Sequence, residues 1–95
     1  MRTMLRWTVP ADRGNEAVQD GSMQTALDAV LARTQPEAAY FLADQGDRSG
    51  IIFFDLKEPS DIPGIAEILF QGLDASVEFI PCMNADDLKK ALAAL

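Results

Sequence analysis

Three polar side chains interrupt otherwise apolar segments of the sequence, and each could contact a ligand. They are Arg6, Tyr40 and Glu78. A guanidinium group can hold an anion, a carboxylate can act as a base, and a phenol can donate a hydrogen bond to a carbonyl oxygen. We therefore select these three as candidate ligand-binding residues and assign no catalytic residue. The structural alternative is a cross-strand ion pair between Arg6 and Glu78, and a half-buried Tyr40 bonded to backbone or water.

The remaining side chains exclude several common kinds of site. The chain has no His and one Cys, Cys82, so catalytic triads, His-based metal sites, Cys clusters and an intrachain disulfide are all excluded. We expect no metal site and no cofactor. Cys82 is interpreted as a small buried hydrophobic residue. Asp86 and Asp87 are interpreted as first-turn helix residues, where the helix dipole favours negative charge.

One glycine-bearing segment resembles a phosphate-binding loop only superficially. A loop of that kind leads into the N-terminus of a helix. Residues 46–50, Gly-Asp-Arg-Ser-Gly, lead instead into an apolar segment of strand type and include an acidic side chain. This pattern favours a hairpin turn.

Length and charge limit the class of protein. The 95 residues suit a single domain, residues 1–95, and the net charge is −7 from 8 basic and 15 acidic residues. Scattered basic residues speak against nucleic acid and against an anionic membrane surface. No segment approaches a membrane span, and Arg6 interrupts the first apolar run, so we expect neither a membrane helix nor a signal peptide. We expect a cytoplasmic, acidic protein.

The elements that must position the candidate residues follow from hydrophobic periodicity. Alternation with period two predicts strands at residues 3–9, 38–43, 51–56 and 76–80. Helical spacing predicts a helix over about 23–33, a second that starts within residues 59–63 with Pro63 in its first turn, and a third from Asn84 to residue 95. Residues 11–20 suit a short helix or an irregular turn. We expect Ser22, Ser60 or Asp61, and Asn84 to cap the three helices.

The element order predicts an α+β fold of ferredoxin-like βαββαβ type with an extra C-terminal helix. Right-handed crossovers then give a four-stranded antiparallel sheet with order 4-1-3-2 and two helices on one face. The third strand is apolar on both faces, with Ile51 and Phe53 opposite Ile52 and Phe54. Helices cover only one face, and monomers seldom expose a large apolar patch. We therefore expect a homodimer in which two sheets face each other, with higher assembly left open.

Several segments resemble a family of uncharacterised bacterial proteins in the dimeric α+β barrel group. They are LRWTVPA (5–11), DGS (20–22), PEAAYF (36–41), FFDL (53–56) and EFIPCMNADDL (78–88). The resemblance implies a dimeric barrel and no established activity. The wider group includes cofactor-free monooxygenases, muconolactone isomerases, haem-degrading enzymes and stress-induced proteins, whose functional residues have no matching motif here.

Three hypotheses for function follow. The first is a small dimeric barrel that binds an organic molecule in its lumen. The second is a cofactor-independent isomerase or monooxygenase of the barrel group. The third is a structural or interaction module whose barrel is filled by side chains. An open lumen of roughly 300 Å³ or more would favour the first two.

Overall fold

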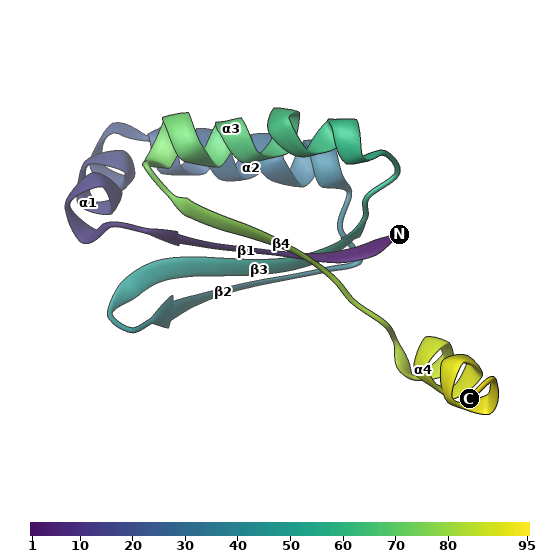
Figure 1. The fold of residues 1–95 in the computed structure, drawn as a ribbon. Coiled ribbons are helices and arrows are strands. Elements are labelled where there is room, and N and C mark those ends of the chain that lie inside the picture. The colour runs from purple at the N-terminus through teal and green to yellow at the C-terminus, as the bar shows by residue number, and fades with distance from the viewer.

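The computed structural model describes residues 1–95 as a sheet with helices packed on one side (Figure 1). Nine elements follow one another along the chain. They are β1 (Arg2–Val9), α1 (Ala11–Asp20), α2 (Ser22–Thr34), β2 (Ala38–Asp44), β3 (Asp47–Asp55), a short 3₁₀ helix η1 (Pro59–Asp61), α3 (Ile62–Leu73), β4 (Ser76–Pro81) and α4 (Ala85–Ala93).

The sheet has four strands, all paired antiparallel, in the order β2-β3-β1-β4. This is the predicted order 4-1-3-2 read from the opposite edge, so the predicted α+β fold with a four-stranded antiparallel sheet is confirmed. The arrangement is compatible with a ferredoxin-like fold. The first crossover contains two helices, because residues 11–20 form α1 rather than an irregular turn.

The hydrophobic core lies between the sheet and the pair α2 and α3 (Figure 1). Alternate residues of β1 face the helices and are buried, as the period-two pattern predicts. Trp7 is one of them and belongs to the core. The largest fully buried side chains are Leu5, Val9, Val30, Ile52, Leu69 and Leu73.

A two-residue turn joins β2 to β3. Gln45 and Gly46 both have positive φ, 52° and 84°, as in the turns that match the twist of paired strands. The strands continue to Asp44 and from Asp47, so they are longer than the sequence indicated. This geometry confirms a hairpin and excludes a helix-leading phosphate loop.

Of the three predicted helix caps, the one at Ser22 is wrong, the one at Asp61 holds in position only, and the one at Asn84 is confirmed. Gly21 occupies the N-cap position of α2 with φ 85°, and Ser22 is the first helical residue. Asp61, one of the two residues predicted to cap α3, occupies its N-cap position at the end of η1, but its side chain makes no capping hydrogen bond. Asn84 does cap α4, because its side chain accepts a hydrogen bond from the Asp87 backbone N–H and the Asp87 carboxylate accepts one from the Asn84 N–H.

The last helix stands apart from the rest of the chain. Figure 1 shows α4 beyond the end of the sheet, on the side away from α2 and α3. Every residue from 83 to 95 is exposed, including the apolar stripe Leu88, Leu92 and Leu95. No helix in the structure combines the length and apolar character needed to cross a bilayer.

Candidate functional site

The three candidate residues lie on the face of the sheet that the helices leave bare, which we call the open face. Along β1 its residues alternate with the buried ones. Strand pairing arranges them in rows that run across the sheet. Tyr40 is opposite Ile51, Ile51 is opposite Arg6, and Arg6 is opposite Glu78. All three candidates therefore belong to one row.

The two neighbouring rows have a different character. On one side the row is apolar and consists of Ala38, Phe53, Met4 and Ile80; on the other it consists of Leu42, Ser49, Thr8 and Ser76. Rows on one face are separated by two residues, or roughly 7 Å. The row of Arg6 is thus bordered by hydrocarbon on one side and by small hydroxyl side chains on the other.

Arg6 and Glu78 form the predicted ion pair. The Nη2 of Arg6 donates to Oε1 of Glu78 at 2.8 Å, and its Nε donates to the same oxygen at 3.2 Å. The second carboxylate oxygen of Glu78 accepts no hydrogen bond from the chain. The side chains are 41% and 55% exposed, and a pair in that environment stabilises a fold by about 0–1 kcal/mol.

Tyr40 shares the row but does not contact the ion pair. Ile51 lies between Tyr40 and Arg6 in the strand register, so the backbones of these two residues are two strand spacings apart, roughly 10 Å. Tyr40 is 62% exposed and lies on the edge strand β2. Its hydroxyl makes no hydrogen bond within the chain. The phenol is therefore available to a partner or ligand.

No principal hollow of the single chain lies at this row. The larger hollows lie elsewhere, for example the one of about 780 Å³ beside α2 and α3 that includes Thr25 and Gln71. None of the five principal hollows includes Arg6, Tyr40 or Glu78. A ligand held by this row needs a second surface to cover it.

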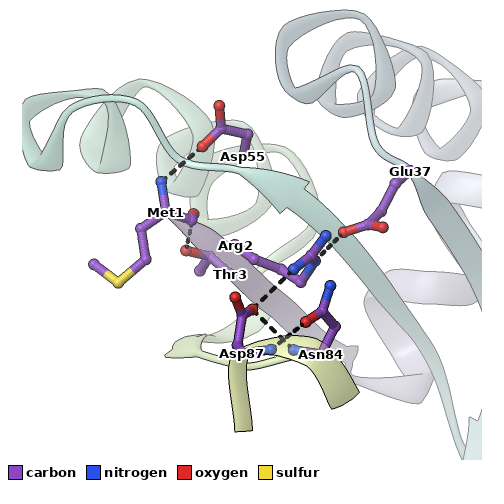
Figure 2. A network of polar contacts seen from close by, with 7 residues as sticks. All are labelled: Met1, Arg2, Thr3, Glu37, Asp55, Asn84 and Asp87. Carbon is purple, nitrogen blue, oxygen red and sulfur yellow. Dashed lines mark hydrogen bonds and ion pairs between the residues drawn. The ribbon is translucent and has the colours of Figure 1, made fainter. Parts of the chain in front are cut away.

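Arg2 forms a second polar network, which the sequence analysis missed (Figure 2). Its Nε donates to Oε1 of Glu37 at 2.6 Å, and its Nη1 donates to Oδ2 of Asp87 at 3.2 Å. The hydrogen bond and charge of Glu37 raise the pKa of Arg2 above its ordinary value. The same Asp87 closes the capping box of α4 with Asn84. Arg2 therefore connects β1, the approach to β2 and the start of α4.

The remaining residues considered from the sequence are Cys82, Asp86 and Asp87, and their contacts are those of structural residues. Cys82 is partly buried, and its backbone N–H donates to the Arg2 carbonyl at 3.1 Å. Arg2 and Cys82 also border one hollow, so a cation is near this thiol in space although none is near in sequence. Asp86 and Asp87 lie in the first turn of α4, as predicted. No group of three or more His, Cys, Asp or Glu side chains is arranged to hold a metal ion.

No protein-family model matches this chain, and no curated protein sequence is similar to it.

Proposed function

We propose that two copies of the chain pack their open faces together and hold a small organic molecule between them. The observation that carries this proposal is the row that contains Arg6, Glu78 and Tyr40. It places an ion pair near one edge and a free phenol at the other edge of a bare sheet face that also carries Met4 and Phe53. Apolar surface of this kind is usually covered in a working protein.

The chemistry of the row defines the ligand class. Arg6 offers N–H donors, the free oxygen of Glu78 accepts, and the Tyr40 hydroxyl does either. The apolar row with Phe53 and Ile80 suits hydrocarbon. We expect a mostly apolar molecule, with a carboxylate or carbonyl group for Arg6 and Tyr40 and a hydroxyl group for Glu78. The resemblance to the dimeric α+β barrel group agrees with this proposal.

Native mass spectrometry of the purified protein tests assembly and ligand together. We expect a dimer that retains a small organic mass, and loss of that mass in both Glu78→Gln and Arg6→Gln. Glu78→Gln keeps the shape of the side chain and removes its charge, and Arg6→Gln removes the charge with a shorter polar side chain. Asp28→Asn, on the exposed face of α2, is the matched control and should retain the ligand.

Two results would contradict the proposal. If the protein stays monomeric at high concentration, the proposed site between two subunits does not exist. A dimer with no retained mass and a lumen filled by side chains would favour the structural module instead. If the ligand also turns over, the free oxygen of Glu78 is the group that would act as the base, and a panel of quinol and lactone substrates would reveal the enzymatic alternative.

A further inference from the structure

The helix α4 has an apolar stripe but no surface of its own chain to pack against. Leu88 and Leu92 are 45% and 57% exposed, and Leu95 is almost fully exposed. An isolated helix shorter than about 12 residues is marginal in water, and α4 has 9 residues. Its capping box and the ion pair between Arg2 and Asp87 stabilise only its first turn. The helix therefore needs a packing surface that the single chain does not provide.

The size and shape of the molecule indicate how much surface is missing. A compact monomer of 10.3 kDa exposes about 5,400 Å², whereas this chain exposes 6076 Å². The excess of roughly 700 Å² is close to the ~800 Å² that each partner contributes to a stable interface. The radius of gyration is 14.8 Å, against about 12.4 Å for a compact domain of this length. The chain thus exposes the area of half a dimer interface.

The most exposed apolar residues of the edge strand β2 lie away from α4. Tyr40 and Leu42 lie on β2, the outer strand at the opposite edge of the sheet from β4. Three strand spacings, roughly 14 Å, separate the two edges. Figure 1 shows that β2 runs away from the end of the sheet at which α4 lies. A second copy of the chain can bring such an edge strand against the stripe of α4.

The anchor of α4 directs the helix toward a molecule on the open face. Arg2 belongs to that face, in register with Asp55, and its guanidinium bonds Asp87 in the first turn of α4 (Figure 2). The helix continues from there on the side away from α2 and α3 (Figure 1). A second copy packed on the open face would therefore meet α4.

We propose that α4 is an exchanged arm that packs its Leu88 and Leu92 stripe on a second copy of the chain, against apolar residues that include the partner's Tyr40 and the partner's Leu42. This inference rests on the proposed face-to-face dimer. It adds a second contact between the subunits, at the edge strand on which the ligand-binding row ends.

The test compares two double variants of the full chain. Leu88→Gln with Leu92→Gln removes the stripe, and Asp86→Gln with Lys89→Gln changes the polar face of the same helix at unchanged net charge. Glutamine is a good helix former, and all four residues are exposed, so both variants should fold. Sedimentation velocity gives the dimer dissociation constant, and hydrogen exchange reports whether the amides of α4 are protected.

We expect the stripe variant to raise the dimer dissociation constant at least about a hundredfold, because four leucine side chains per dimer lose their contacts. The control should stay within about threefold. Amides of α4 should be protected in the dimer and lose protection on dilution.

Three outcomes would contradict the proposal that α4 is an exchanged arm. If the stripe variant dimerises equally well and the amides of α4 are unprotected from hydrogen exchange, the exchanged-arm proposal is wrong while the proposal of a ligand-binding dimer stands. If no dimer forms at any concentration, both proposals fail. If α4 is protected independently of concentration, the helix packs on its own chain.

Discussion

The two faces of the sheet carry similar residues and have different surroundings. On the helix face, Leu5 and Ile52 are fully buried beneath α2 and α3. One position along the same strands, Met4, Ile51 and Phe53 are only partly buried on the open face. The apolar content of a strand does not explain this difference, because both faces of β3 are apolar. The difference lies in which face the chain can cover by itself.

This comparison separates two kinds of information in one strand. Residues on the helix face specify how the chain folds, since they bury their surface against α2 and α3. Residues on the open face gain nothing from that fold, and their apolar character favours a partner. A one-residue shift in strand register would exchange the two sets. The sheet therefore encodes the fold on one side and, by our proposal, the assembly on the other.

Truncating one side chain on each face to alanine should give the largest difference in the free energy of unfolding. Leu5→Ala opens a cavity in a fully buried site and should lower the free energy of unfolding by about 3 kcal/mol. Met4→Ala, the adjacent residue on the open face, should cost less than about 1 kcal/mol in dilute, monomeric protein. Urea unfolding measures both.

Protein concentration sharpens that experiment. If the open face is covered in a dimer, the cost of Met4→Ala grows with protein concentration while the cost of Leu5→Ala hardly changes. Equal costs for the two variants in dilute protein would mean that a single chain already covers its open face, and the comparison would fail.

Gly50 tests how tightly the helix face is filled. It lies between Trp7 on β1 and Phe41 on β2 in the register. A Cβ at this position would clash with Cζ2 of Trp7. The Trp7 ring also packs edge-on against Phe41, with 6.2 Å between the ring centroids. Gly50→Ala should therefore cost about 2 kcal/mol by overpacking, measured by urea unfolding with the near-ultraviolet signal of Trp7 as a second probe.

The neighbouring Ser49 is the matched control, because it lies on the opposite face of β3 from Gly50, where its side chain is also buried. Its hydroxyl makes one hydrogen bond, to the Asp47 carbonyl at 3.1 Å, and Ser49→Ala should cost less than about 1 kcal/mol. A larger cost for Ser49→Ala than for Gly50→Ala would contradict the tight packing of the helix face.

Periodicity predicted the sheet and the main contact of the candidate site. Alternation in β1 and β4, together with the strand order, places Arg6 and Glu78 on the same face of neighbouring strands. The structure brings them within hydrogen-bond distance, as predicted. Tyr40 is on the same face for the same reason. Its distance from the pair depends on Ile51 and the strand spacing, which periodicity describes only coarsely.

The network of Arg2 could not be predicted in the same way. It joins residues 2, 37 and 87 through one long side chain, and hydropathy says nothing about such a contact. The predicted order does place the start of β1 beside the end of β4, so a search for charges near that corner would have found Arg2 and Asp87. The cap at Ser22 failed because Gly21 tolerates positive φ and takes the N-cap position itself.

Acid titration should give the smallest effects, and it samples both sides of the sheet. The Ser22 hydroxyl and backbone N–H donate to Asp20 on the helix side and hold its pKa below the ordinary 3.8. The amino group of Met1 does the same for Asp55, which shares the open face with Arg2. A lowered pKa in the folded state means that each carboxylate stabilises the fold above pH 3.8 and loses this contribution as the pH falls through its folded value.

Carbon-13 NMR titration of the aspartate carboxyl groups measures both midpoints. We expect both below 3.8, with Ser22→Ala moving the Asp20 midpoint upward because it removes the hydroxyl donor and leaving Asp55 unchanged. Acid should therefore weaken the two sides independently, since the two carboxylates share no hydrogen-bond partner. An Asp55 midpoint that follows Ser22→Ala would mean that the helix layer and the open face are coupled through the sheet, contrary to the separation that the two faces otherwise show.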